Sequence, residues 1–551
     1  MTGPGIASMR KWASATAFIL AALLFTGAID VDMQRLLRGQ EVLVAMYKAI
    51  LTEYVDPVPP DELLRAASRG MFSSIDPYAE LIEDNSSAEM DILNRGAYGG
   101  LGIKVLTWNG QHYVSFIYDA VRDSIPLKAG DVILRVDSTV VGGDQQGGLR
   151  NLLRGQPGTQ VRVLVRRAGV GDTAEYTLTR RTIDVAPVPY AEEAAPGIAY
   201  VKLSRFSRFA ADSVRAQLLA LGGRERIRGV VLDLRDNPGG LLESAVSVMS
   251  TFVDMGTPVV SMRGRNEHLT RDYVTTVAPL LTDIPMVLLV NRKSASASEI
   301  VAGAVQDLDR GVLLGTRTFG KGLVQTVLPL GHRASLKLTT ARYYIPSGRC
   351  IQRLRYVNGK AVQVESTDST AAVFSTRRLG RLVRESTGIT PDVRVTEDSL
   401  PPFLLCLANA HAVFRFAASR VDGARSVPPV DRRMMQDFTR WCVEQDLCGD
   451  SELQRHFDAL MNSARHYALD AKTLATLRSL QGKMRADVAA EVQRHWTSLS
   501  RDLELEFALQ RIGEREYLRR GNRGDAQLSE ALRMLGNASL YQATLEQGPD
   551  Y

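Results

Sequence analysis

The stretch PMVLLVNRKSASASEIVAGAV, Pro285 to Val305, joins a short apolar run to a polar turn and then to a helical pattern rich in small residues. A continuous apolar run of this length predicts a buried strand, and the turn residues mark its end. Similar runs occur in IAYVKL, VVLDL and GVLLGT, and they alternate with helical patterns between Ala191 and Pro401. This alternation indicates an α/β architecture.

The turn after the first run carries three serines, Ser294, Ser296 and Ser298. A serine hydroxyl is a good nucleophile at neutral pH only when a neighbouring base takes its proton. Spacing alone does not select among the three serines. The segment SASE also fits a capping box, in which Ser296 caps the helix and Glu299 reaches back. A capping serine can still be nucleophilic, because the positive end of the helix dipole favours developing negative charge.

The candidate base is Lys321, in the segment FGKGLVQ that ends at Gln325. A lysine amine acts as a base only where removal from water lowers its pKa from roughly 10.4 toward neutrality. Gly320 and Gly322 suit close backbone packing, and the apolar residues after them supply cover. In an extended strand Lys321 and Gln325 lie on the same face, so Gln325 can orient the amine. The pairing indicates a serine hydrolase of the Ser-Lys type.

A second turn of interest comes after the strand pattern VVLDL in VVLDLRDNPGGLLESAV, Val230 to Val246. Gly239 and Gly240 permit backbone amides to approach a ligand closely, as an oxyanion hole requires. A plain structural turn is the alternative explanation of the same residues.

Four motifs occur in a fixed order: VLDLRDNPGG, NRKSASASEI, TRTFGKGLVQT and YYIPSGRCIQ. Together they resemble the signature of the carboxyl-terminal processing (tail-specific) protease family, and the similarity extends over roughly residues 36–395. The resemblance implies a crotonase-like catalytic core. It selects Ser296 as the nucleophile and Lys321 as the general base, with Gln325 supporting the lysine.

The same resemblance places the oxyanion hole on the amide of Ala297 and on Gly239 or Gly240, without deciding between the two glycines. Asp233, Arg235 and Asn237 are expected to hold the geometry of the strand and turn rather than to move protons. The nearby histidines, His268 and His332, match no position of the resemblance, which disfavours a Ser-His-Asp triad.

The segment from Ala97 to Val141 resembles a PDZ domain, a module that binds the C-terminal ends of peptides. In such a domain, backbone amides of the loop GGLGIKV receive the terminal carboxylate while the peptide adds as an edge strand. The resemblance assigns this role to four residues: Gly100, Leu101, Gly102 and Ile103. Alternation in VRVLVRR and EYTLTRR predicts closing strands up to about Arg181. A simple hairpin connection is the alternative for the glycine-rich loop.

The chain is expected to have five parts: residues 1–29 as a signal peptide or membrane anchor, 30–95 as an N-terminal helical region, 96–182 as the PDZ domain, 183–400 as the protease core and 401–551 as a C-terminal helical domain. Arg10 and Lys11 precede an apolar run of a length between a signal peptide and an anchor. Either outcome exports the domains after this run, because the positive flank stays inside. We therefore expect a periplasmic enzyme, anchored to the inner membrane if the segment is kept.

The helical parts have two further features. The region after the apolar run predicts two amphipathic helices, broken at DPVPP and SSIDP. In the C-terminal part, Leu453, Phe457, Leu460 and Met461 fall on one helical face. Bundle core is the simplest explanation, and an oligomer interface or adaptor-docking surface is the alternative.

The composition narrows the classes of partner and cofactor. A hydrophobic content of 45% over 551 residues leaves room for a large core in several domains. A net charge of +6 without a lysine-arginine block does not suggest nucleic acid. Cys350, Cys406, Cys442 and Cys448 form no zinc pattern, and no metal or cofactor is expected. Cys442 and Cys448 are close enough for a disulfide, with two free buried thiols as the alternative.

These observations predict an exported serine endopeptidase that recognises and cleaves near the C-terminal tails of proteins. Its partners are expected to be polypeptides with free C-termini, an adaptor protein and further copies of the chain. One alternative is a catalytically silent PDZ scaffold that only captures peptides. A second is acyl-CoA chemistry on a crotonase-like fold, which the peptide-binding module disfavours.

Overall fold

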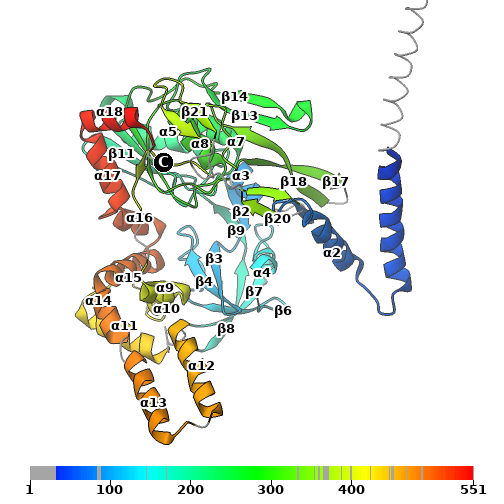
Figure 1. Cartoon of the computed structure of the whole chain (residues 1–551), viewed down its shortest axis with the longest axis vertical. Coiled ribbons are helices and arrows are strands. Elements are labelled where there is room, and N and C mark those ends of the chain that lie inside the picture. Colours follow the sequence, from blue (N-terminus) through cyan, green and yellow to red (C-terminus); the bar gives the residue numbers. More distant parts are fainter. Residues whose placement is uncertain are drawn as a thin grey trace, which may run out of the picture. The chain divides into compact units, whose positions relative to one another are not determined.

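The computed structural model describes most of the chain (Figure 1). The described residues are 33–83, 88–143, 146–168, 171–331, 334–352, 354–357, 360–363, 372–385, 388–396, 400–421, 424–445, 447, 452–467, 469–485 and 488–549. The predicted signal or anchor segment, His332 and Cys448 lie outside them. Among the described residues, no helix is long and apolar enough to cross a membrane.

The chain divides into two compact units, and the smaller one contains the residues up to Glu83 together with 326–338 and 356–362. Residues 33–53 are helical, and α2 (Pro60–Phe72) begins at a proline, which suits the first turn of a helix. The predicted breaks at DPVPP and SSIDP are thereby confirmed. β1 (Glu80–Glu83) pairs antiparallel with residues 334–337 of β18 (Ala334–Tyr344).

The larger unit contains a six-stranded sheet in the order β10-β11-β12-β15-β16-β23. The bounds are β10 (Tyr190–Ala195), β11 (Ile198–Lys202), β12 (Gly229–Asp233), β15 (Met286–Val290), β16 (Val312–Gly315) and β23 (Val393–Arg394). All neighbouring pairs are parallel except β10 with β11. This sheet confirms the α/β architecture, and β11, β12, β15 and β16 are the four apolar runs of the sequence.

Both faces of the sheet are covered, because successive side chains of a strand point to opposite sides. Val230 and Leu232 join the core formed with helices α5 (Ala210–Ala220), α7 (Leu242–Met249) and α8 (Ala297–Asp307). Val231 lies in the opposite core, formed with α17 (Ala526–Leu535) and α18 (Ala538–Gln547). These last two helices, drawn in red in Figure 1, belong to the predicted C-terminal helical domain, and their apolar faces complete the core on this side of the sheet.

The remaining elements in this part of the chain are short. They are α6 (Gly223–Arg226), η1 (Glu267–Leu269), β13 (Pro258–Gly264), β14 (Arg271–Val274), β17 (Leu323–Gly331), β19 (Leu354–Val357), β20 (Lys360–Gln363), β21 (Val373–Ser375) and β22 (Leu382–Arg384). Residues 341–344 of β18 pair with β13, which pairs with β14. β17 pairs with β18 in the same antiparallel sheet.

Residues 97–184 form a segment with its own core, which contains a six-stranded and a two-stranded antiparallel sheet. Its strands and helices are β2 (Ala97–Gly100), β3 (Ile103–Trp108), β4 (Gln111–Ile117), β5 (Val132–Val136), β6 (Thr139–Val140), α4 (Gln146–Leu153), β7 (Gln160–Arg166), β8 (Thr173–Thr179) and β9 (Arg181–Asp184), preceded by α3 (Ala88–Arg95). The closing strands predicted from alternation are β7 and β8. β3 lies at the edge of its sheet, and β2 pairs with β9.

Five of the C-terminal helices build a further core around Phe416, Phe438 and Phe507: α9 (Pro402–Asn409), α10 (Ala412–Ala418), α11 (Arg432–Glu444), α14 (Val488–Arg494) and α15 (Trp496–Arg511). The same region also contains α12 (Glu452–His466), α13 (Ala471–Arg485) and α16 (Glu514–Asn522). On α12, Met461 is buried whereas Leu460 is 50% exposed, so the predicted stripe is only partly buried.

The state of the cysteines differs from the Cys442–Cys448 disulfide considered from the sequence. Cys442 is free and buried among the aromatic side chains of this helical core. Cys406, in contrast, is disulfide-bonded. A Cys442–Cys448 disulfide is therefore wrong, because the Cys442 thiol packs as an apolar side chain.

Candidate active site

Ser296 lies at a sharp turn between β15 and α8. Its backbone has φ 56° and ψ −115°, a conformation that a residue with a side chain rarely adopts. Ser296 is half-buried, whereas every residue of α8 is buried. The predicted capping box is confirmed, since the Ser296 N–H donates to Glu299 Oε2 at 2.9 Å. Strain of this kind is kept where the surrounding structure enforces it, often at a catalytic residue.

The other two serines of the turn are used to hold it together. The Ser294 hydroxyl donates to the carbonyl oxygen of Leu234 at 2.8 Å and accepts from the Asn291 N–H at 2.9 Å. The Ser298 hydroxyl donates to the carbonyl oxygen of Asn237 at 2.9 Å, and both serines are fully buried. These hydrogen bonds distinguish Ser294 and Ser298 from Ser296, whereas spacing in the sequence did not.

The turn of the NPGG motif lies directly against Ser296. A Cβ placed on Gly239 would come within 2.6 Å of the Ala295 carbonyl oxygen and 2.9 Å of the Ala297 nitrogen. The Gly239 φ of 100° also favours glycine. Its own N–H donates to Asn237 Oδ1 at 2.9 Å. The Ala297 N–H donates to no group in the part of the chain that the structure describes. The structure therefore brings Gly239 and Ala297 together beside the serine.

Gly240 packs in another direction. A Cβ there would lie 2.2 Å from the Phe206 carbonyl oxygen, so only glycine fits against that backbone. The Phe206 N–H donates to the Gly239 carbonyl oxygen at 3.0 Å, and the Leu241 N–H donates to the Phe206 carbonyl oxygen at 2.8 Å. Residues 203–206 and the NPGG turn are thereby held together by backbone bonds.

Asp233, Arg235 and Asn237 form the support behind this turn. The Asp233 carboxylate is buried and accepts from Tyr200 at 2.7 Å and from Arg235 at 2.7 Å. Burial alone would raise the pKa of Asp233, but Lys202 and Arg235 hold it below its ordinary value. Arg235 also pairs with Asp525 of the C-terminal helices at 2.7 Å. These contacts accord with the structural role expected for Asp233 and Arg235.

Glu299 joins the serine turn to the lysine loop, a role that its capping position in the sequence did not reveal. Besides the Ser296 N–H, its carboxylate accepts from the Thr318 hydroxyl at 2.6 Å, the Gly320 N–H at 2.7 Å and the Lys321 N–H at 2.9 Å. Glu299 is fully buried. Burial raises the pKa of Glu299 to about 7 from an ordinary value of 4.5, although these donors act in the opposite direction.

Lys321 lies two residues before β17, so the prediction that it belongs to the same strand as Gln325 is wrong. The Gly320 and Lys321 N–H groups donate to Glu299 instead of to a neighbouring strand. Gln325 is in β17 and its Nε2 lies 3.4 Å from Thr339 Oγ1. The buried Tyr343 hydroxyl bonds the carbonyl oxygens of both Ser296 and Lys321. The serine turn and the lysine loop are therefore joined twice, through Glu299 and through Tyr343.

Glu299→Gln is expected to loosen this junction and to change the pH dependence of stability. Glutamine replaces one carboxylate oxygen with an NH₂ group, which cannot accept a hydrogen bond. The buried groups that donate to that oxygen therefore lose their acceptor. The pKa of Glu299 is about 7 in the folded protein and 4.5 in the unfolded chain, so protonation of this carboxyl group stabilises the fold. The contribution is complete below pH 4.5 and is lost as the pH rises through 7. The difference between the two pKa values corresponds to roughly 3 kcal/mol, at about 1.4 kcal/mol for each pH unit.

Denaturation midpoints between pH 4.5 and 8 check this expectation. Wild-type stability should fall over this interval, and the slope should be smaller in Glu299→Gln, so the cost of the substitution is largest at low pH. Glu175→Gln, which removes an exposed carboxylate of β8, should keep the wild-type slope. Equal slopes in all three proteins would show that Glu299 does not titrate in this range.

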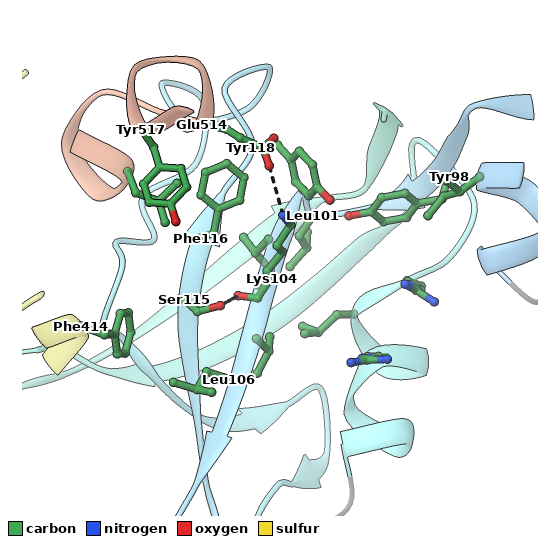
Figure 2. Close-up of a pocket in the computed structure, with 18 of the residues that line it drawn as sticks. Tyr98, Leu101, Lys104, Leu106, Ser115, Phe116, Tyr118, Phe414, Glu514 and Tyr517 are labelled. Carbon is green, nitrogen blue, oxygen red and sulfur yellow. Dashed lines mark hydrogen bonds and ion pairs between the residues drawn. The ribbon is translucent and has the colours of Figure 1, made fainter. Parts of the chain in front are cut away.

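The residues predicted to bind a peptide terminus lie at a cavity of about 770 Å³. Leu101, Gly102 and Ile103 line it, between β3 and α4 (Figure 2). Gly100 does not line it, because it pairs with Arg181 at the end of β2. The cavity also has lining residues from the C-terminal helices, which the sequence did not indicate.

Comparison with known proteins agrees with this geometry. Residues 197–358 match the model of peptidase family S41, and residues 405–535 match the C-terminal helical domain of probable PDZ-proteases. The chain is 34% identical to a carboxy-terminal-processing protease of Bartonella bacilliformis, over 62% of this chain and 77% of that protein. It is 30% identical to the carboxy-terminal processing protease CtpA of Bacillus subtilis, over 56% and 65%.

A solved photosystem II D1 C-terminal processing protease is also similar, with 26% identity, 66% and 94% of the two chains covered and a TM-score of 0.36. The helix-start serine and these relatives define the protein as a serine peptidase. It belongs to peptidase family S41, and its relatives are carboxy-terminal processing proteases. The resemblance seen in the four sequence motifs is confirmed.

Proposed function

We propose that this peptidase is an exported endopeptidase that cuts proteins near their C-terminal tails with a Ser296–Lys321 pair. The observation that carries the proposal is the strained Ser296 turn, joined through the Glu299 carboxylate to the loop of Lys321. A scaffold that only captured peptides would need neither the strain nor the junction.

The proposed reaction proceeds through an acyl-enzyme. Ser296 Oγ attacks the scissile carbonyl carbon as Lys321 Nζ takes its proton, and Lys321 then gives that proton to the leaving amine. Water activated by Lys321 hydrolyses the ester and frees Ser296. Gln325 orients Lys321, and the Ala297 N–H with an amide of Gly239 or Gly240 stabilises the oxyanion. The Gly239 N–H would have to release Asn237 Oδ1 to take this role, whereas the Gly240 N–H has no acceptor among the described residues. The Ala297 N–H is open to that role, since it has no acceptor among the described residues.

The fold supplies a place for the tail. In this proposal residues 96–182 are a PDZ domain inserted beside a crotonase-like core. Support comes from β3, an edge strand to which an extended peptide can add, and from the cavity beside it. Holding a tail there raises its effective concentration near Ser296.

Export to the periplasm is part of the proposal, with residues 1–29 as the signal or inner-membrane anchor. A disulfide-bonded Cys406 supports an oxidising compartment. We also propose that the chain associates with further copies or with an adaptor. Large apolar side chains of the helix at 33–53 support association, since Leu36 is 65% and Val44 61% exposed.

Intact-mass spectrometry of an unstructured protein that ends in nonpolar residues tests the function. The full chain should convert it to products truncated near the C-terminus, and it should cut a version ending in charged residues at least about tenfold more slowly. Cleavage that is equally fast for both ends, or that begins at the N-terminus, would contradict tail recognition while leaving the peptidase assignment intact.

A further inference from the structure

The cavity beside β3 is built by three separate parts of the chain. Besides the sheet of residues 97–184, the protease core contributes Arg205, and the C-terminal helices contribute Phe414, Glu506, Leu509, Glu514 and Tyr517. Figure 2 shows Glu514 and Tyr517 on the side of the cavity opposite Tyr98. Only the first part belongs to the segment that resembles a peptide-binding domain.

Two backbone N–H groups in the lining of the cavity can donate hydrogen bonds to a ligand. Leu101 and Gly102 are buried, and neither N–H donates to any group within the described ranges. The Gly102 carbonyl oxygen accepts from the Tyr118 N–H at 2.9 Å, which fixes the loop. Buried N–H groups are nearly always paired, so two open amides in a lined cavity indicate a ligand oxygen.

Two arginines, Arg154 and Arg205, line the same cavity. Both act electrostatically on the Tyr118 hydroxyl, as Glu514 also does, and the Arg154 guanidinium lies 5.2 Å from the centre of the Tyr98 ring. Arg205 is half-buried and forms no ion pair with a carboxylate among the residues described. A half-buried arginine beside open amides suits a carboxylate, which can accept from both.

The C-terminal helices add negative charge to the lining of the cavity. Glu514, at the start of α16, lies 3.7 Å from the Lys104 ammonium of β3 and is 37% exposed. Glu506 lines the same cavity, and its carboxylate accepts from Gln510 at 2.7 Å. At 3.7 Å the Lys104 pair is loose, so Glu514 retains acceptor capacity for a second cation.

We propose that Arg205 and Glu514, which lie outside the PDZ-like segment, determine which tails this groove accepts. Arg205 binds the terminal carboxylate together with the Leu101 and Gly102 N–H groups. Glu514 binds a basic side chain a few residues before the terminus, while the nonpolar last side chain packs against Ile103 and Leu153. This inference rests on the proposed function, the recognition of protein tails. It specifies the chemistry of the tail that is bound, which has a free terminal carboxylate and a basic residue a few positions before it.

Fluorescence anisotropy with the full chain carrying Ser296→Ala, which cannot cut the probe, measures this selection. Three labelled ten-residue peptides are compared: one with a nonpolar last residue and a lysine three positions earlier, the same peptide with a C-terminal amide, and the same peptide with glutamate for lysine. The amide is expected to bind about tenfold more weakly than the acid. The glutamate peptide is expected to bind roughly threefold to tenfold more weakly than the lysine peptide.

Variants then assign each preference to its residue. Arg205→Ala should reduce the acid-to-amide ratio to less than about threefold, and Glu514→Lys should reverse the lysine-to-glutamate preference. Arg208→Ala and Glu530→Lys are matched controls, since Arg208 is exposed and neither residue lines the cavity. Both controls should leave the ratios unchanged, and thermal midpoints establish that each variant is folded.

The outcomes distinguish a wrong residue assignment from a failure of tail recognition as a whole. An acid-to-amide ratio that survives Arg205→Ala, or a charge preference that survives Glu514→Lys in a folded protein, would overturn the assigned residue. If acid and amide peptides bind the Ser296→Ala chain equally, tail recognition in this groove fails as a whole. Cleavage by the wild-type chain would in that case still stand as the proposed peptidase activity.

Discussion

Ser296→Ala is expected to lower kcat/KM for a tail-bearing substrate by about 10⁴-fold or more, because loss of a catalytic nucleophile removes the covalent route altogether. The fold should be retained. The contact of this residue with Glu299 is made by its backbone N–H, which alanine keeps. Steady-state cleavage of the unstructured substrate measures the loss, and anisotropy with the same tail should show unchanged binding.

Ser294→Ala and Ser298→Ala provide the matched controls. Each removes a fully buried hydroxyl that bonds a backbone carbonyl, so each should lower stability by about 1–3 kcal/mol. Below their midpoints both variants should still cut the substrate. Full activity in Ser296→Ala, with either control inactive although folded, would move the nucleophile to a neighbouring serine.

Four strands of the core could be predicted because each is a short, mostly apolar run. VVLDL and PMVLLV need no distant partner to be recognised as buried strands, and β12 and β15 occupy them. The docking of the last two helices was not predictable in this way. An amphipathic pattern says that α17 and α18 bury one face, but not that the partner is a sheet formed more than two hundred residues earlier.

The candidate site shows the same limit. The capping pattern around Ser296 and Glu299 was visible because its two members are three residues apart. The other partners of Glu299, Thr318 and Gly320, lie 19 and 21 positions away, and only the fold brings them to it. A glutamate near the start of a helix rich in small and apolar residues was the available signal. It indicated burial without indicating the partner.

The position of Lys321 was misjudged for a related reason. Alternation over FGKGLVQ assumes that a strand begins at the lysine, yet β17 begins at Leu323. The backbone N–H groups before it are taken by Glu299, and the Gly322 N–H by Gln352 Oε1 at 2.7 Å. Side-chain acceptors from elsewhere in the fold thus delay the start of the strand, and sequence periodicity cannot register them.

Lys321→Ala is expected to abolish cleavage nearly as completely as Ser296→Ala, with kcat/KM reduced by about 10⁴-fold. The loop should survive, because the bonds to Glu299 and Tyr343 come from the backbone N–H and carbonyl of residue 321. Thermal midpoints and anisotropy with a tail peptide should remain near wild type. The double variant should be no slower than either single one, since the two groups act in the same step.

Lys321→Arg distinguishes a base from a mere positive charge. Arginine keeps the charge, but its guanidinium stays protonated at any working pH and cannot take the Ser296 proton. We therefore expect Lys321→Arg to be as inactive as Lys321→Ala in the same cleavage assay. Activity within about tenfold of wild type in the arginine variant would mean that residue 321 acts through charge, and that another group removes the serine proton.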